Sequence, residues 1–139
     1  MGAKVNVRKL VLSSFGFKHG VPQDANYVFD VRFVPNPFYV VELRPLSGID
    51  ELVQKYIRSF EETDSFLASA MRFLDFVIPL YLEAERETLH VAVGCTGGRH
   101  RSVAFAEWIR EHYEGISADI GSDFEVEIRH RDVGREPEV

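Results

Sequence analysis

Four short stretches of the chain have the hydrophobic pattern of β-strands, either as alternation of apolar and polar residues or as a short apolar run. They are residues 4–13, 26–33, 88–94 and 124–128. In the second stretch every other residue from Tyr27 to Phe33 is apolar, which predicts one buried face. The segments 14–20 and 34–39 carry glycines or prolines and are predicted to be irregular loops.

Two longer stretches have apolar residues at helical spacing. Ser47 begins an S-x-x-D helix-start signal, and a helix is expected to follow it. Its inward positions are expected to be Ile49, Leu52, Val53, Tyr56, Ile57 and Phe60. Thr63 is predicted to cap a second helix over 64–85, with a kink at Pro79. This helix is apolar almost all round, so burial on most sides is expected.

A third helix is predicted after the segment GGRHRS. Its inward side chains are expected to be Val103, Ala106, Trp108, Ile109 and Tyr113, and its outward ones Glu107, Arg110 and Glu111. Strands separated by helices are typical of an α/β layered domain. We therefore expect one domain over 1–139, with a central mixed sheet flanked by helices and a frayed tail at 133–139.

The composition agrees with one globular domain and removes several functional classes. With 139 residues, 45% of them hydrophobic, the chain can bury a core of its own. The single cysteine can form no disulfide within the chain, which fits a reducing cytoplasm. No apolar run approaches the roughly 20 residues of a membrane helix, and a net charge of −6 is a poor footprint for nucleic acid. We expect a cytoplasmic protein without a membrane segment and, because its histidines are scattered, without a metal site.

The run GCTGGRHRS at residues 94–102 has the composition of an anion-binding loop. An apolar strand leads into it and a helix begins after it, so its backbone N–H groups and the helix dipole favour a bound anion. Its paired glycines let the backbone approach an anion closely. Arg101 can hold two phosphate oxygens with its planar guanidinium, and His100 or Arg99 can add a donor. The pattern predicts a site for a phosphate monoester or a sulfate.

The same run also spells C-x-x-G-x-x-R-S, the spacing of the cysteine-dependent phosphatase loop. In that interpretation Cys95 is a thiolate nucleophile whose pKa is lowered by the electropositive loop, and Ser102 helps to stabilise it. The histidine that usually precedes such a cysteine is Gly94 here. A phosphatase also needs a general acid, for which Asp30 and Asp132 are candidates, and nothing in the sequence selects one. A buried, unreactive cysteine is the alternative to a nucleophile.

Other polar residues fall at the predicted ends of strands or in the loops that follow them. Ligands bind near the carboxyl ends of strands in open α/β sheets, so these residues are expected to converge on the loop 95–101. They are His19, Asp30, Arg32, His130 and Asp132. Their carboxylates suit a sugar ring or an ammonium group on the ligand, with local turn bonding and surface pairing as the alternative. Asn36, between two prolines, is expected to fix a turn rather than to contact a ligand.

Together these segments resemble the C-terminal domain of the RNase adapter protein RapZ family. The matching stretches are 14–20, 29–50, 94–103 and 129–132, in the family's order and over nearly the whole chain. The resemblance implies a domain similar to a phosphofructokinase-type α/β subdomain, which in some bacteria senses glucosamine-6-phosphate and presents a small RNA to an RNase. The ligand residues that it implies are His19, Asp30, Cys95, Thr96, Gly97, Gly98, His100, Arg101, Arg131 and Asp132.

Two features depart from the pattern of that family. The chain has no G-x-x-x-x-G-K-[ST] motif, so the family's binding of ATP or GTP is not expected here, and Met1 favours a stand-alone domain over an excised one. The tail RDVGREPEV is nearly neutral, whereas the RNA-binding members end in a basic tail.

We therefore expect a regulatory domain, not an enzyme, that works without a cofactor. It is expected to bind an amino sugar phosphate on the loop 95–101 and to pass this state to a partner protein. One alternative is an RNA-binding adapter, for which the basic residues at 99–101 and 129–131 argue. The other is a phosphatase with Cys95 as its nucleophile. A homo-oligomer is compatible with all three.

Overall fold

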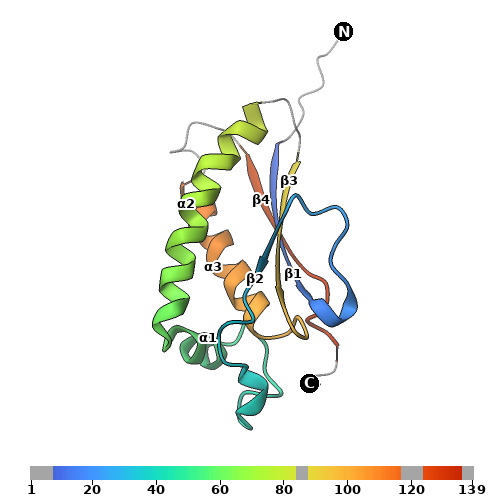
Figure 1. The fold of residues 1–139 in the computed structure, drawn as a ribbon, viewed down its shortest axis with the longest axis vertical. Helices are drawn as coiled ribbons and strands as arrows, with labels where there is room; N and C mark the ends of the chain where they lie inside the picture. The colour runs from blue at the N-terminus through green and yellow to red at the C-terminus, as the bar shows by residue number, and fades with distance from the viewer. Residues whose placement is uncertain (1–7, 84–87, 117–123, 136–139) are drawn as a thin grey trace.

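The structure, a computed structural model, describes residues 8–83, 88–116 and 124–135, and its strands form one sheet (Figure 1). The strands are β1 Lys9–Gly16, β2 Tyr27–Asp30, β3 Thr88–Cys95 and β4 Glu125–His130. They stand in the order β2-β3-β1-β4, and all three neighbouring pairs are parallel. The predicted α/β class is therefore confirmed, but the expected mixed sheet is wrong.

The connections between the strands explain why they are parallel. Antiparallel neighbours can be joined by a hairpin, whereas parallel strands need a crossover connection. Here each connection carries the chain from the carboxyl end of one strand back to the end of the sheet where the next strand begins. Residues 17–26, with the 3-10 turn η1 Phe17–His19, separate β1 from β2. The later connections contain the 3-10 turn η2 Pro37–Tyr39 and the helices α1 Glu51–Arg58, α2 Glu61–Glu83 and α3 Arg101–Ile116.

The described helices pack on one face of the sheet, and the core lies between them and that face (Figure 1). Helix α3 packs against β1, β3 and β4, and α2 packs against β3. The strand residues in this core are apolar and buried: Leu10, Leu12, Leu89, Val91 and Val93. Residues 17–26 lie on the other side of the sheet (Figure 1). The two faces are therefore covered by different kinds of structure.

The strands differ from the predicted ranges mainly at their ends. The sequence pattern places residues 14–16 in a loop, whereas β1 continues to Gly16. The polar Ser14 is accommodated inside the sheet because its hydroxyl oxygen lies 2.6 Å from His130 Nδ1, at hydrogen-bond distance. Strand β2 ends at Asp30, earlier than predicted, where the chain turns. Three predicted segments lie outside the described residues: 4–7 of the first strand, 84–85 of the second helix and 136–139 of the frayed tail.

Helix α1 begins at Glu51, later than the S-x-x-D signal. That signal forms a turn before the helix, in which the Ser47 N–H donates to Asp50 Oδ2 at 2.7 Å. Val53 and Ile57 are buried in the core, and Tyr56 and Phe60 pack against it, as expected. Ile49 and Leu52 were also expected to face inward but are exposed. Asn36 behaves as predicted, since its Oδ1 accepts a hydrogen bond from the Phe38 N–H at 3.1 Å.

Helix α2 begins at Glu61, so Thr63 lies inside its first turn and does not cap it. The Thr63 hydroxyl instead donates to the Ile57 carbonyl at 2.6 Å, which ties α2 to α1. The expectation of burial on most sides is wrong, because α2 packs on the sheet with one side and leaves three large side chains exposed. These are Phe73, Phe76 and Leu80. No helix in the described part of the chain is long and apolar enough to cross a membrane.

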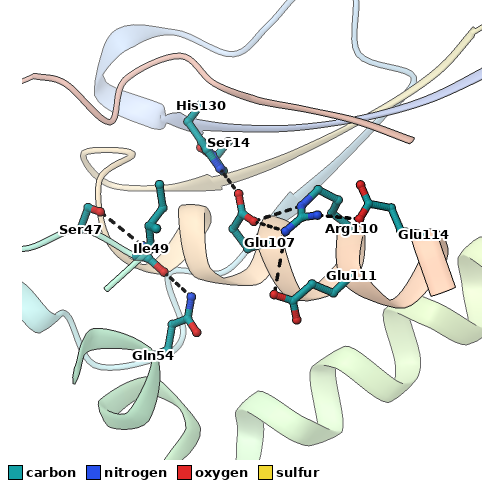
Figure 2. Close-up of polar contacts among 10 residues, drawn as sticks. Ser14, Ser47, Ile49, Gln54, Glu107, Arg110, Glu111, Glu114 and His130 are labelled. Atoms are coloured by element: carbon teal, nitrogen blue, oxygen red, sulfur yellow. Dashed lines mark hydrogen bonds and ion pairs between the residues drawn. The ribbon is translucent and has the colours of Figure 1, made fainter. Parts of the chain in front are cut away.

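The inward residues predicted for α3 are all buried, but Glu107 does not face outward. Figure 2 shows it reaching His130, whose Nε2 lies 2.6 Å from Glu107 Oε2 and whose Nδ1 lies 2.6 Å from Ser14 Oγ. Burial acts to raise the pKa of Glu107, but hydrogen bonds from His130 and Arg110 hold it below its ordinary value. Glu107 therefore joins α3 to β4 and β1 as an ionised carboxylate.

Candidate functional site

The described strands all end at one edge of the sheet, and the predicted site residues gather there. Because the strands are parallel, their carboxyl ends lie together, which is where ligands bind in open α/β sheets. Strand β3 ends at Cys95 and runs into the loop 96–100, and α3 begins at Arg101. The backbone N–H of Lys18, in η1, donates to the Thr96 carbonyl at 3.3 Å. The turn η1, which also carries His19, therefore lies beside this loop.

The loop crosses directly over the end of β1 (Figure 1). An ideal Cβ on Gly16 would lie 2.4 Å from the carbonyl carbon of Gly97, and one on Gly98 would lie 2.4 Å from the Gly16 nitrogen. Gly98 also has a φ of +78°, which favours glycine. The glycines are therefore required by a backbone crossing inside the protein, in addition to any anion that they let approach.

The backbone N–H groups of the loop are not used to hold the described fold together. None of the amides of residues 96–100 donates a hydrogen bond to another residue that the structure describes. The loop instead contributes acceptors, since the Arg99 carbonyl binds the Gly48 N–H at 2.9 Å and the His100 carbonyl binds the Ala104 N–H at 3.1 Å. Free amides at the start of a helix are a favourable environment for an anion, because the helix dipole adds partial positive charge there.

Arg101 is a buried cation at the start of α3. The whole residue is only 4% exposed. Its Nη1 donates to the carbonyls of Arg32 at 3.1 Å and Val34 at 2.8 Å, and its Nη2 donates to Thr96 Oγ1 at 3.3 Å. Its Nε is buried and has no hydrogen-bond partner among the described residues.

No carboxylate in the described ranges forms an ion pair with Arg101, which makes it unusual, because buried charges are normally paired. Burial lowers the pKa of Arg101, while Cys95 and Asp30 act in the opposite direction. A guanidinium nevertheless stays protonated in proteins. The site therefore holds a fixed positive charge that an anionic ligand would neutralise.

Cys95 is buried at the end of β3, where its side chain lies next to Arg101. The residue is 2% exposed, and its thiol donates to Ser102 Oγ at 3.2 Å. The pairing of the cysteine with the hydroxyl that follows Arg101 is the contact expected from the C-x-x-G-x-x-R-S spacing. A buried thiol in this position equally serves as part of the wall beneath the loop.

Asp30 lies at the same edge but is paired with a neighbour. Arg32 donates to it twice, from Nε to Oδ1 at 2.9 Å and from Nη2 to Oδ2 at 2.6 Å, and the guanidinium of Arg32 lies 4.0 Å from the centre of the Phe17 ring. The hydrogen bond from Arg32 is the main reason why the pKa of Asp30 lies below its ordinary value. Asp30 is therefore an exposed carboxylate near neutral pH and holds no proton to donate.

Asp132 is fully buried and fixes the end of β1. Its Oδ2 accepts the Gly16 N–H at 2.8 Å, and Arg131 and Arg135 form ion pairs with it at 2.9 and 3.0 Å. Burial acts to raise the pKa of Asp132, but these donors hold it below its ordinary value. Arg131 also donates to the Gly20 carbonyl at 2.7 Å. Asp132 and Arg131 thus hold the end of β1, over which the loop 96–100 crosses.

The two predicted histidines differ. His100 is buried, and its Nε2 lies 3.1 Å from the carbonyl oxygen of Leu43. Burial is the main reason why the pKa of His100 is lowered. His19 Nε2 is buried and has no hydrogen-bond partner within the described ranges. His19 and Arg101 thus each bring an unsatisfied nitrogen to this edge of the sheet.

Sequence reasoning named Arg99 only as a donor to the anion, and it missed that Arg99 and Gly48 hold the loop in place. Arg99 donates to four backbone carbonyls, those of Leu46, Pro45, Val133 and Arg135. Gly48 packs so closely that an added Cβ would lie 2.2 Å from the His100 carbonyl oxygen. The isolated glycines at the end of β1 and before α1 were the available signal, because such glycines often mark a close backbone approach.

Comparison with known proteins identifies a family. The model of the RapZ C-terminal domain matches residues 8–134. A nucleotide-binding protein of Macrococcus caseolyticus is 46% identical over 129 residues, which are 93% of this chain and 41% of that protein. Proteins with the same description from Geobacillus thermodenitrificans and Staphylococcus aureus are 44% and 46% identical, over 91% and 87% of this chain and 40% and 38% of theirs. The chain thus spans about two fifths of the length of these relatives.

Proposed function

Because this chain belongs to the RapZ C-terminal domain family, we propose that it senses an amino sugar phosphate of the glucosamine-6-phosphate class. The phosphate would bind on the loop 96–100, and the bound state would be passed to a partner protein. The observation that carries the proposal is the buried guanidinium of Arg101, which lacks an anionic partner among the described residues and adjoins the free loop amides.

The phosphate suits this place for electrostatic reasons. It offers several acceptor oxygens to the loop amides, and hydrogen bonds to a charged group contribute about 1.5–3 kcal/mol each. It would also neutralise Arg101, whose burial without an ion-pair partner is unfavourable. The described residues of the site therefore supply a positive charge and donors, to which a phosphate would add acceptors.

In the proposed complex, Asp30 recognises the amino group of the sugar. This carboxylate stands at the same edge, is about half exposed and is ionised near neutral pH. It can therefore pair with an ammonium group or accept bonds from sugar hydroxyls. A phosphosugar without the amino group would keep the contacts to the loop and lose this ion pair.

The proposal is tested by the thermal stabilisation that a ligand produces. Glucosamine-6-phosphate at about 100 times its Kd should stabilise the chain by about 2.7 kcal/mol. Glucose-6-phosphate should bind more weakly, and glucosamine, without the phosphate, should give no shift. Arg101→Ala should abolish the shift, whereas Arg58→Ala on α1 should keep it.

Because Arg101 is buried, its alanine variant needs a folding control. Arg101→Lys keeps the charge without the planar fork, and the circular dichroism of both variants shows whether they fold. A folded Arg101→Ala protein with an unchanged shift would refute the proposal.

A phosphatase is the second candidate, because the Cys95 thiol contacts Ser102 as the C-x-x-G-x-x-R-S spacing requires. Two observations weaken it: the thiol is buried, and Asp30 carries no proton to donate. Turnover of p-nitrophenyl phosphate that disappears in Cys95→Ser would establish it, and absence of turnover at every pH would remove it.

An RNA adapter is a third proposal, but the basic residues that argue for it have intramolecular partners. Arg99 binds four carbonyls, Arg129 binds Glu127, and Arg131 binds Asp132. A structured RNA that binds at physiological salt, with affinity falling steeply as salt rises, would support it. Binding that is absent at physiological salt would defeat it.

A further inference from the structure

A second pocket lies away from the loop 96–100, on the face of the sheet opposite to the helices. Its volume is about 330 Å³. It is lined by Val11, Asp24, Asn26, Thr88, His90 and Arg129. Val11 and His90 are neighbours across β1 and β3, and they point away from the core because the alternate positions, Leu10 and Leu89, point into it. The pocket shares no lining residue with the candidate anion site.

A buried histidine with an unsatisfied nitrogen forms part of its wall. His90 is 6% exposed, and its Nε2 lies 2.6 Å from Ser13 Oγ. Its Nδ1 is buried and has no hydrogen-bond partner in the described parts of the chain. Asp24 Oδ2 lies 3.5 Å from this nitrogen, in a geometry that forms no hydrogen bond. Buried polar atoms are normally satisfied, so a group of a ligand is expected beside Nδ1.

The wall around this nitrogen is held rigidly. The His90 N–H donates to Asn26 Oδ1 at 2.8 Å, and the Asn26 N–H donates to the His90 carbonyl at 2.8 Å. These two bonds fix the covering segment 17–26 to β3 next to the histidine. Asp24, two residues earlier, is thereby kept at the pocket with its carboxylate mostly exposed. A ligand would meet a site whose backbone is already in place.

Opposite charges stand on opposite sides of the pocket. Asp24 lies beside His90 of β3, whereas Arg129 belongs to β4, and β1 runs between those two strands. Strands are about 4.8 Å apart, so β3 and β4, which carry His90 and Arg129, lie about 10 Å apart with β1 between them. Along β1, His90 is level with Val11, and Arg129 is level with Ser13. Arg129 uses Nε and Nη2 on Glu127, which leaves Nη1 for another acceptor.

We propose that this pocket binds a small zwitterion of the amino-acid type. Its ammonium group pairs with Asp24 and donates to His90 Nδ1, while Ser13 accepts from the protonated Nε2 of the same ring. Its carboxylate pairs with Arg129, and its apolar part lies on Val11. A metal ion does not suit the site, because no group of three metal-ligating side chains occurs among the described residues. The proposal is independent of phosphosugar binding.

The test is a titration of the isotope-labelled chain, followed by the backbone amide signals in NMR. Each standard amino acid is added separately, with ethylamine and acetate as probes that carry one charge only. At least one amino acid should shift the amides of Val11, Asn26 and His90 with a Kd below about 1 mM, and leave those of Gly97 and Gly98 in place. Ethylamine and acetate should bind at least about tenfold more weakly.

Two variants at exposed positions identify the charges. Asp24→Asn and Arg129→Gln should each weaken binding at least about tenfold, because each removes one ion pair. Glu125→Gln, which removes a charge from β4 outside the pocket lining, should leave the Kd unchanged. The proposal is overturned if no amino acid shifts these signals up to about 10 mM. It is equally overturned if binding survives in both variants, or if a probe with one charge binds as tightly.

Discussion

Replacing Gly16 by alanine tests how the loop 96–100 is held at the end of β1. The new Cβ would lie 2.4 Å from the carbonyl carbon of Gly97 and 2.5 Å from its oxygen, well inside the 3.0 Å below which real Cβ contacts essentially never occur. The obstacle is backbone, which cannot rotate away as the end of a long side chain can. Either the loop moves off β1, or β1 moves and strains the bond from the Gly16 N–H to Asp132.

The size of the effect follows from these two contacts. Overpacking of a tight site costs about 1–3 kcal/mol. Weakening one buried hydrogen bond to a carboxylate adds about 1.5–3 kcal/mol if the bond is lost. Because the chain relaxes by whichever movement is cheaper, we expect a loss of about 2–4 kcal/mol in the free energy of unfolding. For a chain of 139 residues this lowers Tm by about 3 °C for each kcal/mol.

Urea denaturation followed by far-ultraviolet circular dichroism measures this loss. Gly134→Ala is the matched control, since an added Cβ there has nothing within 4 Å, and its effect should stay within about 0.5 kcal/mol. Gly16→Ala should also weaken binding of glucosamine-6-phosphate at temperatures where both variants are folded, because the loop amides are displaced. If Gly16→Ala unfolds at the same urea concentration as Gly134→Ala, the crossing is not as tight as described.

Three further substitutions test other parts of the fold. Asp132→Asn should lower the free energy of unfolding at pH 7 by about 1–3 kcal/mol in urea titrations. Because the pKa of Asp132 is held below 3.8, the carboxylate stabilises the fold above that pH; the difference from wild type should be constant above about pH 5 and shrink as the pH falls below 3.8. A pH-independent difference would contradict this. Glu107→Gln should cost about 1–2 kcal/mol and speed hydrogen exchange in β4, since His130 loses a charged acceptor; unchanged exchange would count against that link. Phe76→Ser, on the exposed side of α2, should change stability by less than about 0.5 kcal/mol, and a cost above about 1 kcal/mol would show that this side is covered.

Local patterns predicted the elements around the site well, because they depend on residues close in sequence. The strand that ends at Cys95, the glycine loop and the inward side of α3 all follow from spacing along one segment. The direction of the strands does not, since pairing joins residues far apart, such as Ser14 of β1 and His130 of β4. The exposure of Phe76 was unpredictable for the same reason, because it depends on which side of α2 meets the sheet.

The glycines show where a correct pattern received an incomplete explanation. Sequence reasoning assigned Gly97 and Gly98 to the close approach of an anion. The structure adds a second demand, the crossing of Gly16, which lies 81 positions from Gly97 and becomes its neighbour only through the register of β1 with β3. Nothing in the run GCTGGRHRS distinguishes these two demands. A substitution at Gly98 therefore changes the support of the loop together with any ligand contact that the loop makes.

Arg99 in the loop and Arg101 at the start of α3 differ in their hydrogen bonds. Of these two, Arg101 keeps a buried nitrogen without a partner among the described residues. Arg99 donates to four carbonyls on both sides of the loop, so its removal should release the loop from residues 45–46 and 133–135. Arg101, two positions later, is more deeply buried and yet keeps its Nε without a partner among the described residues. A basic patch would make the two interchangeable. Arg99 maintains the shape of the loop, so loss of binding in an Arg99 variant would say little about a ligand. Loss of binding in a folded Arg101 variant would support the anionic ligand that we propose.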